Sequence, residues 1–365
     1  MNQHLGILGG GQLGSMLALA ARPLGLDVTV LDPNAESPAR VAATHILAPY
    51  DDEDALRRLG ECDWITFEFE NIPDAAARQL EQTGHVSPPA EALRVAQDRW
   101  TEKNTFQDLG IRTAEFRKVD SLADAKASFA ELGALVLKTR RFGYDGKGQA
   151  VVRELSQLEE AYKSLQGAPA IAERLIPFDR ELSILICRGR DDSFEIYPLT
   201  QNIHQDGVLR TSIAPAPNIS KKVQASAEKV AQTLVQHLSY VGVLALELFQ
   251  VGDELLVNEF APRVHNSGHW TIEGAVTSQF ENHVRAVCGL PLGSAALRCP
   301  SVMTNLLGSI PHRSKILSFE DAHLHDYGKS PRAGRKVGHV TCLGNTMSEA
   351  LKRAQKVEEL LTPVK

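Results

Sequence analysis

The stretch of sequence that decides the fold is Gly143-Tyr144-Asp145-Gly146-Lys147-Gly148-Gln149. Two predicted β-strands flank it, Ala134–Thr139 and Gln149–Arg153. Its glycines permit positive φ angles and a close approach of the backbone to a ligand. The stretch is not a Walker phosphate loop, because no Ser or Thr follows Lys147 and no helix is expected after it. It predicts a flap that closes over a polyphosphate, or else a plain hairpin tip.

The strand before this loop helps to distinguish a phosphate-covering flap from a plain hairpin tip. Lys138 follows the apolar run Leu135-Val136-Leu137. An ammonium group in such surroundings needs a polar or anionic partner. This requirement favours a ligand-binding loop over a plain hairpin tip.

A second feature is a predicted hairpin that carries two glutamates. Its strands are Leu244–Gln250 and Leu255–Phe260, joined around Gly252-Asp253-Glu254. With a three-residue loop, Glu247 lies opposite Glu259 on one face, with Cβ atoms roughly 5 Å apart. Two such carboxylates repel each other unless a cation lies between them, and oxygen ligands on a rigid sheet suit Mg²⁺.

This predicted metal site depends on the number of residues in the turn. A two-residue turn would shift the register and place Glu247 and Glu259 on opposite faces of the hairpin. Asn258 points away from Glu259 unless a β-bulge turns it inward, where its amide oxygen would be a neutral ligand.

The N-terminal segment alternates strands and a helix. We expect strands at Leu5–Leu8, Asp27–Leu31 and Trp64–Phe67, with an apolar helix at Ser15–Arg22. This order predicts a parallel sheet that binds ligands at the carboxyl ends of its strands.

A glycine motif follows the first of these strands, with the sequence Gly9-Gly10-Gly11-Gln12-Leu13-Gly14. Its GxGxxG spacing, with Asp32 at the end of the next strand, is typical of a dinucleotide site. The alternative is a tight strand–helix turn without a ligand.

The rest of the chain has an α+β pattern. Ser87-Pro88-Pro89 is a rigid break, after which one helix is expected over Arg94–Leu109. The other expected elements are strands at Ala170–Leu175 and Arg180–Cys187 and helices at Lys221–Leu238 and Ser348–Leu361. We expect three domains, 1–95, 96–296 and 297–365, the central one divided into 96–174 and 175–296.

Two basic segments complete the motifs. Arg263 and His265 follow the second glutamate strand, where they are well placed for an anion beside the metal. The spacing of His265 and His269 suits zinc, but Pro262 disfavours a helix there and no third soft ligand is evident. The turn Arg332–His339 is either a phosphate site or a solvated cationic loop.

Composition excludes several classes of function. The 365 residues carry a net charge of −6 and the isoelectric point is near 6.1, so neither nucleic-acid nor membrane binding is expected. The five cysteines are scattered without a Cys-x-x-Cys pair, which argues against disulfides or a thiolate zinc site. With no basic leader and no apolar run of membrane-spanning length, we expect a cytoplasmic protein.

Together these motifs resemble the ATP-grasp superfamily. Three strings are similar to its branch of 5-(carboxyamino)imidazole ribonucleotide synthases: Gly10–Gly14, Gly143–Gln149, and Asn258–Trp270 with its ending His-Asn-Ser-Gly-His-Trp. The resemblance extends from the first glycine turn to Lys336. It implies an ATP-grasp fold, α/β and α+β, with an N-terminal Rossmann-like domain and a small C-terminal domain.

The resemblance also implies roles for individual residues. ATP would be held by Arg99, Lys138, the lid residues Gly143, Tyr144, Asp145, Gly146, Lys147, Gly148 and Gln149, the adenine-lining segment Glu173, Arg174, Leu175 and Ile176, and Glu181, His204, Asn258 and Glu259. The metal ligands would be Glu247 and Glu259. The ribonucleotide would contact Gln12, Leu13, Tyr144, Asn266, Arg335 and Lys336. The residues closest to the chemistry would be Asp145, Arg263, His265 and Lys336, with Asp145 as the candidate proton acceptor.

The implied reaction is the ATP-dependent carboxylation of 5-aminoimidazole ribonucleotide by bicarbonate, through carboxyphosphate, in purine biosynthesis. Two Mg²⁺ ions are expected, with Mn²⁺ as a substitute. The partners are small molecules, and a homodimer is expected from the resemblance.

Three alternatives stay open. A dehydrogenase would explain Gly9–Gly14 and Asp32 but would leave the lid and the glutamates unexplained. Another ATP-grasp carboxylase or a formate-using ligase is closer, and the string His265–Trp270 disfavours it. A non-catalytic ATP-binding regulator is disfavoured because the charged positions that such a protein would lose are all present.

Overall fold

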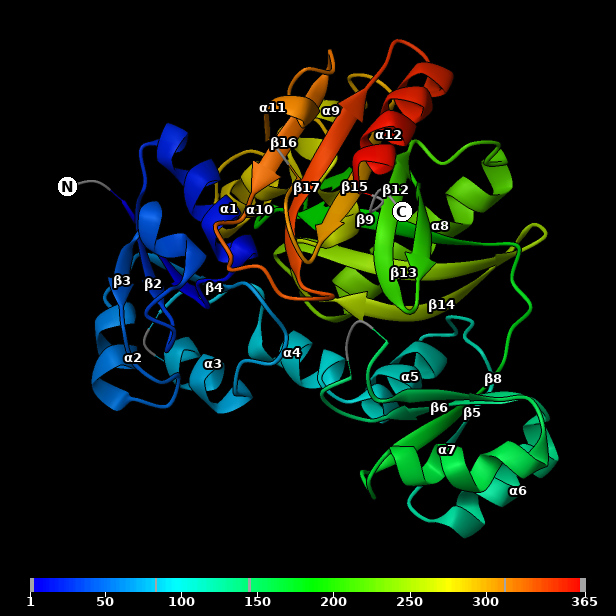
Figure 1. Ribbon diagram of the computed structural model, residues 1–365. Helices are drawn as coiled ribbons and strands as arrows, with labels where there is room; N and C mark the ends of the chain where they lie inside the picture. The colour runs from blue at the N-terminus through cyan, green and yellow to red at the C-terminus, as the bar shows by residue number, and fades with distance from the viewer. Residues whose placement is uncertain (1–2, 83, 144–145, 312, 362–365) are drawn as a thin grey trace.

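The computed structural model describes residues 3–82, 84–143, 146–311 and 313–361. Within these ranges the strands form three sheets. Figure 1 shows the N-terminal sheet at one side of the largest sheet, and a third sheet, followed by helices α6 and α7, below it. No helix in the described ranges is long and apolar enough to cross a membrane.

The N-terminal sheet is parallel, with the strand order β3-β2-β1-β4. Its strands are β1 (His4–Leu8), β2 (Asp27–Leu31), β3 (Thr44–Ile46) and β4 (Trp64–Phe67), and its helices are α1 (Gln12–Ala21), α2 (Glu53–Leu59) and α3 (Asp74–Glu81). The three strands predicted here are confirmed, and the predicted apolar helix begins three residues earlier than expected. Buried side chains of α1 share one core with those of α10 (Gln279–Val287), which joins this sheet to the rest of the molecule.

The glycine turn before α1 binds the protein's own carboxylates. Glu68, just after β4, accepts hydrogen bonds from the backbone N–H of Gly11 (2.6 Å) and of Gly14 (2.8 Å). Asp32 accepts one from the N–H of Gly10 at 2.7 Å. Amides at a helix N-terminus are the groups that hold the phosphates of a dinucleotide. Because they are already occupied here, the turn does not favour NAD.

The connection to the next domain contains two helices where the sequence predicted one. They are α4 (Ala90–Ala96) and α5 (Arg99–Asp108). The break falls at Asp98, whose backbone is extended and whose carboxylate accepts from the N–H groups of Trp100 (2.9 Å) and Thr101 (3.3 Å). The prediction of a continuous helix was wrong because Asp98 caps a new helix instead of continuing the old one.

The lid-bearing sheet is antiparallel, in the order β5-β8-β6-β7. Its elements are β5 (Phe116–Val119), α6 (Leu122–Leu132), β6 (Leu135–Thr139), β7 (Gln149–Val152), α7 (Leu158–Ser164) and β8 (Ala170–Arg174). β6 pairs with β7 from Leu135–Val152 to Lys138–Gln149, so the glycine-rich stretch is the loop of a hairpin as predicted. Buried residues of α6 and α7 form one core with the sheet.

The largest sheet is antiparallel and follows the order β14-β13-β9-β11-β12-β15-β17-β16. Its strands are β9 (Arg180–Arg188), β11 (Thr200–Gln205), β12 (Val208–Ala214), β13 (Gly242–Val251), β14 (Glu254–Ala261), β15 (Ser301–Leu307), β16 (Ala322–Asp326) and β17 (Lys336–Leu343), with β10 (Phe194–Ile196) paired to β9. The remaining helices are α8 (Lys221–His237), α9 (Thr271–Gly274), α11 (Arg313–Ile316) and α12 (Met347–Leu361), with 3₁₀ turns η1 (Arg22–Leu24), η2 (Pro38–Val41), η3 (Leu155–Gln157) and η4 (Asn266–Gly268). The strands after residue 297 thus continue the central sheet.

The hairpin β13–β14 closes differently from the prediction. Val251 pairs with Glu254, so the turn has two residues rather than three. Leu248 pairs with Val257, but Glu247 pairs with Glu259, which leaves Asn258 as the extra residue of a β-bulge. The predicted turn was wrong and the predicted pairing of the glutamates is confirmed, because the bulge restores the register that the shorter turn removes.

The glycine turn gives a test of this packing. A Cβ atom at Gly14 would lie 2.6 Å from the carbonyl oxygen of Gly9, a backbone atom that cannot rotate away. We expect Gly14→Ala to lower the free energy of unfolding by about 1–3 kcal/mol, the usual cost of overpacking. Urea unfolding followed by circular dichroism measures this, with Ser15→Ala in the same helix as the control. A Gly14→Ala protein as stable as the Ser15→Ala protein would contradict the packing described here.

Candidate active site

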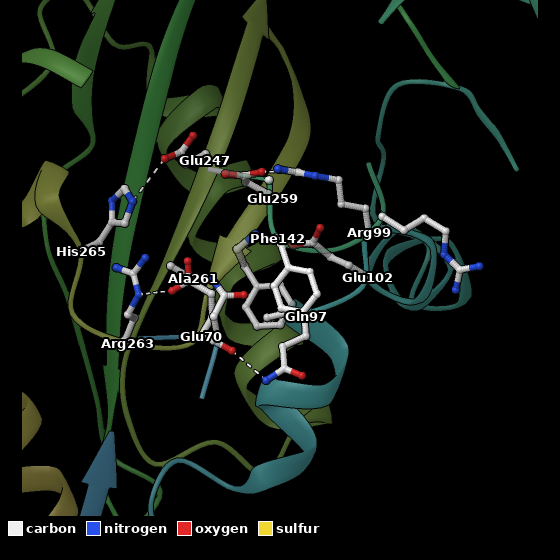
Figure 2. A pocket seen from close by; sticks show the side chains of 15 residues that line it. Glu70, Gln97, Arg99, Glu102, Phe142, Glu247, Glu259, Ala261, Arg263 and His265 are labelled. Atoms are coloured by element: carbon white, nitrogen blue, oxygen red, sulfur yellow. Dashed lines mark hydrogen bonds and ion pairs between the residues drawn. The ribbon is translucent and has the colours of Figure 1, made fainter. Parts of the chain in front are cut away.

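One pocket is lined by residues after β4, by residues from α4 to the lid, and by the hairpin β13–β14 with the residues that follow it. Figure 2 shows the glutamates of the hairpin on one wall, Arg99 beside them and Phe142 of the lid root across the opening. The lining residues are Glu70, Asn71, Ala96, Gln97, Arg99, Glu102, Arg140, Phe142, Gly143, Glu247, Glu259, Phe260, Ala261, Arg263 and His265. Residues predicted to serve ATP, metal and bicarbonate therefore meet in one place.

The two glutamates of the hairpin have different electrostatic surroundings. Burial and the charge of Glu259 raise the pKa of Glu247. Burial would also raise the pKa of Glu259, but the charges of Arg99 and Lys138 outweigh it and lower that pKa. Arg99 forms an ion pair with Glu259, whereas Glu247 Oε1 lies 3.3 Å from Nε2 of His265. A cation near Glu247 would relieve the repulsion between the two carboxylates.

The donor set at this position fits Mg²⁺. Glu247 and Glu259 offer carboxylate oxygens from adjacent strands of a rigid sheet, which suits a hard cation. Among the described residues, no group of three or more His, Cys, Asp or Glu side chains is placed to hold a metal by itself. Two carboxylates match Mg²⁺ that takes its other ligands from substrate phosphates and water.

Asn258, the bulge residue, faces a buried lysine. Lys138 donates from Nζ to Asn258 Oδ1 at 3.1 Å and to Glu173 Oε2 at 3.0 Å. The partner that the sequence required for Lys138 is thus Glu173, which is 2 % exposed. Burial favours the neutral carboxyl, but the charges of Lys103 and Lys138 outweigh it and lower the pKa of Glu173 to about 2. Glu173 and Asn258 thus fix the position of the Lys138 ammonium group next to Glu259.

His265 and Arg263 lie next to the carboxylates. Burial and the charge of Arg263 lower the pKa of His265 to about 3, so its ring is neutral. The N–H of Ser267 donates to His265 Nδ1 at 3.3 Å, which leaves the proton on Nε2, the atom that faces Glu247. Arg263 forms an ion pair with Glu70, which lies just beyond β4.

The root of the lid is fixed to the break between α4 and α5. Arg140 binds Asp98 through two hydrogen bonds of 3.0 and 2.6 Å. Arg141 donates to Gln97 at 2.9 Å, and Gln97 in turn donates to the carbonyl of Glu70 at 2.8 Å. The lid root is therefore tied to the edge of the N-terminal domain. Tyr144 and Asp145 lie outside the described residues.

Two glycines of the lid have a left-handed backbone that favours glycine. Gly146 and Gly148 have φ angles of 75° and 70°. A Cβ atom at Gly146 would lie 2.9 Å from the carbonyl oxygen of Asp206, in the turn between β11 and β12. The lid thus approaches the central sheet closely at this glycine. Lys147 and Gln149 follow on the same hairpin, with Gln149 beginning β7.

The residues predicted to line the nucleoside occupy the passage from the lid sheet to the central sheet. Arg174 ends β8, and the connection to β9 contains Leu175 and Ile176. Glu181 on β9 accepts from His204 Nδ1 on β11 at 2.7 Å. Burial alone would lower the pKa of His204, but the hydrogen bond to Glu181 and the charge of Glu247 outweigh it and raise that pKa.

The described residues predicted to hold the ribonucleotide come from the start of α1, from the turn η4 and from the segment that leads into β17. Asn266 pairs its amide with that of Asn305 on β15, at 3.0 and 2.7 Å. Gln12, next to Leu13 at the start of α1, accepts from Lys329. Arg335 donates to Ser330 Oγ at 3.0 Å, and Lys336 begins β17.

The zinc alternative fails on geometry in the described chain. His265 and His269 flank the 3₁₀ turn Asn266–Gly268 rather than standing on one helical face. His269 is fully buried and contacts Gln279 at 3.2 Å and the ring of His339 at a centroid distance of 5.0 Å. Its burial lowers its pKa far below the ordinary value.

Several residues of the pocket were missed from the sequence. Glu68 and Glu70 had a usable signal, because they follow β4 at the edge where parallel strands present ligand groups. Gln97, Glu102 and Lys103 had none, since they lay within the segment predicted as one continuous helix. Glu102 and Lys103 matter because α5 packs against β14, and the sequence does not show which strand this helix contacts.

Comparison with known proteins agrees with this geometry. Residues 1–97 match the family model of the ribonucleotide synthetase preATP-grasp domain, residues 104–280 the ATP-grasp domain, and residues 301–353 the phosphoribosylaminoimidazole carboxylase C-terminal domain. N5-carboxyaminoimidazole ribonucleotide synthase of Pseudomonas aeruginosa is 47 % identical over 98 % of this chain and 99 % of that protein.

Solved structures agree in the same way. The crystal structure of N5-carboxyaminoimidazole ribonucleotide synthetase from Thermus thermophilus is similar with a TM-score of 0.94 and 50 % identity, over 99 % of this chain and all of that one. The Aspergillus clavatus enzyme, in complex with ADP and 5-aminoimidazole ribonucleotide, has a TM-score of 0.92 and 32 % identity, over 99 % and 98 % of the two chains. The chain therefore has the ATP-grasp fold and belongs to the N5-carboxyaminoimidazole ribonucleotide synthase family.

Proposed function

We propose that this protein carboxylates 5-aminoimidazole ribonucleotide with bicarbonate and ATP, giving 5-carboxyaminoimidazole ribonucleotide, ADP and phosphate for purine biosynthesis. The observation that carries the proposal is the meeting of Glu247, Glu259 and Arg263 in one pocket, with Lys138 hydrogen-bonded to Asn258 next to Glu259, in a family whose named members are synthases of this product. The complex of the Aspergillus clavatus relative with ADP and 5-aminoimidazole ribonucleotide supports the choice of substrates.

The chemistry begins with bicarbonate, which is a poor electrophile. One of its oxygens attacks the γ-phosphorus of ATP, ADP leaves, and carboxyphosphate forms. Carboxyphosphate loses phosphate to give CO₂, whose carbon is attacked by the substrate amine as that nitrogen loses a proton. Phosphoryl transfer needs positioning and charge neutralisation more than covalent help from the protein.

The residues of the chain supply that positioning and charge. Arg99 lines the pocket and Lys138 is hydrogen-bonded to Asn258 next to it, and both side chains would neutralise the charge of the ATP phosphates. Glu247 and Glu259 would hold Mg²⁺, which when bound neutralises phosphate charge during transfer. Asn258 would help to orient that site through its hydrogen bond with Lys138.

The other side of the pocket would serve bicarbonate and the ribonucleotide. Arg263 and neutral His265 would orient the bicarbonate through N–H groups. Asn266, Arg335, Lys336 and the Gln12-Leu13 turn would hold the ribonucleotide. The lid would exclude water, which would otherwise hydrolyse carboxyphosphate.

Further assignments belong to the proposal. They are two Mg²⁺ ions with Mn²⁺ as a substitute, a cytoplasmic homodimer, and domains at residues 1–95, 96–296 and 297–365. The nucleotide contacts proposed for the lid, for Glu173–Ile176, and for Glu181 and His204 belong to it as well. The five free cysteines support a reducing compartment.

The decisive assay measures ADP release with Mg²⁺, ATP and bicarbonate, with and without 5-aminoimidazole ribonucleotide. We expect release to depend on the ribonucleotide, and isotope-labelled bicarbonate to enter the product in equal amount. Release that does not change when the ribonucleotide is added would exclude the proposed substrate.

The metal assignment is tested by Glu247→Gln. Because an amide removes a charge from the cation site, we expect turnover to fall on the order of 100-fold or more, with the thermal unfolding temperature little changed. Glu254→Gln is the control, since Glu254 is an exposed glutamate of the same hairpin that pairs with Arg112 at 2.7 Å. Equal activity of the two variants would refute the assignment.

The proton acceptor is tested by Asp145→Asn. The amide keeps the shape of the side chain but cannot accept a proton, so we expect ribonucleotide-dependent turnover to fall by about 10²–10⁴-fold while ATP still binds. Calorimetry measures the ATP binding separately. Near-full turnover in this variant would rule Asp145 out.

A further inference from the structure

The strand that carries Glu259 is the edge of the central sheet. β14 pairs with β13 on one side and has no strand paired along the other in the described chain. An edge strand presents backbone N–H and C=O groups that need partners when they are buried. Near the tip of the hairpin, Val257 meets the segment before β5, where its N–H donates to the carbonyl of Arg112 at 2.8 Å. Beyond that point the neighbour of the edge is helix α5.

Three side chains of α5 meet this edge from one face of the helix. Arg99, Glu102 and Lys103 are spaced i, i+3 and i+4, and residues so spaced are neighbours on a helix surface. Arg99 pairs with the carboxylate of Glu259. Glu102 and Lys103 are 2 % and 0 % exposed, so their polar groups need partners inside the protein.

Those partners are backbone groups on either side of Glu259. Glu102 Oε1 accepts from the N–H of Phe260 at 2.7 Å. Lys103 Nζ donates to the carbonyl of Asn258 at 2.6 Å. The residues before and after Glu259 are therefore both held by α5.

Asn258 is held at its side chain as well. Lys138 donates to its Oδ1 at 3.1 Å, and Lys138 and Lys103 share the carboxylate of Glu173, at 3.0 and 3.4 Å. The extra residue of the bulge thus has its backbone carbonyl and its amide oxygen fixed by two neighbouring lysines.

The bulge held by these contacts determines whether Glu247 and Glu259 lie on the same face of the hairpin. With a two-residue turn and no bulge, Glu247 would pair with Asn258, and Glu259 would point to the other face of the sheet. The bulge at Asn258 brings Glu259 opposite Glu247. A bulge interrupts the hydrogen bonds of the ladder, so it persists where other groups satisfy the backbone.

We propose that Glu102 and Lys103 are positioning residues that hold the Asn258 bulge in place, so that Glu247 and Glu259 share one face and bind a divalent cation together. The role is distinct from that of Arg99, which touches the carboxylate itself. The proposal rests on the metal assignment within the proposed function.

The test compares two substitutions of one residue. Glu102→Gln keeps an oxygen that accepts from the N–H of Phe260. Glu102→Leu keeps the bulk of the side chain and removes the acceptor. Gln107→Ala, on an exposed position of the same helix, is the matched control.

The measurement is calorimetric binding of ADP to the full chain, with Mg²⁺ and with a chelator. The ratio of the two affinities reports the metal contribution and requires no turnover. We expect Glu102→Leu to reduce this ratio by about 10-fold, as is typical when a residue that orients a metal ligand is lost. Glu102→Gln and Gln107→Ala should stay within about threefold of the unsubstituted protein. ADP affinity in chelator should be the same in all four proteins.

Three results would overturn the proposal: an unchanged ratio in Glu102→Leu, an equal loss in Glu102→Gln, or a fall in ADP affinity that is the same with and without Mg²⁺. If Glu102→Leu does not fold, Glu102→Asp replaces it, since its carboxylate is one methylene too short to reach Phe260, and the same loss is expected in a smaller degree. An unsubstituted protein with this Mg²⁺ dependence but without ribonucleotide-dependent ADP release would refute the proposed reaction and leave the positioning role standing.

Discussion

The site depends on one extra residue in one strand. The two-residue turn of the β13–β14 hairpin would by itself send Glu247 and Glu259 to opposite faces of the sheet, and the bulge at Asn258 reverses that outcome. Everything proposed for the metal and the phosphates follows from this local change in register. A bulge at the edge of a sheet is also accessible to a neighbouring helix, and α5 contacts it there with buried charged groups.

The buried charges around the site form one connected set. Glu173 lies between Lys103 and Lys138, and Arg99 lies beside Glu259. Buried ions are costly unless each has a partner, and here Lys103 and Lys138 both have Glu173 as a partner. The lid root joins the same region through Arg140 and Asp98. The lid root, Glu259 and Lys138 are therefore all connected to the first residues of α5 or to its cap, through Asp98, Arg99 and Lys103.

In the N-terminal domain, a turn with ligand-binding geometry binds two carboxylates of the protein itself. Its strand–turn–helix unit has the glycine spacing of a dinucleotide site, yet Glu68 and Asp32 take the backbone amides that phosphates would need. The turn is therefore fixed by the protein itself. The side chain of Gln12, at the start of α1, accepts a hydrogen bond from Lys329 of the C-terminal part.

The sequence by itself determined the parallel N-terminal sheet, the lid hairpin and the family resemblance, because these depend on local periodicity, on glycine and on motif spacing. It also predicted the pairing of Glu247 with Glu259, but from a three-residue turn that the structure does not have. The tertiary structure alone decided three matters. The first is the break at Asp98, which begins the new helix α5 as its N-cap instead of continuing α4. The bulge needed groups to satisfy the edge of β14, and Glu102 and Lys103 come from residues more than 150 positions away. The partner of Lys138 was Glu173 on a neighbouring strand. Each depends on which elements pack together, and a one-dimensional pattern does not contain that information.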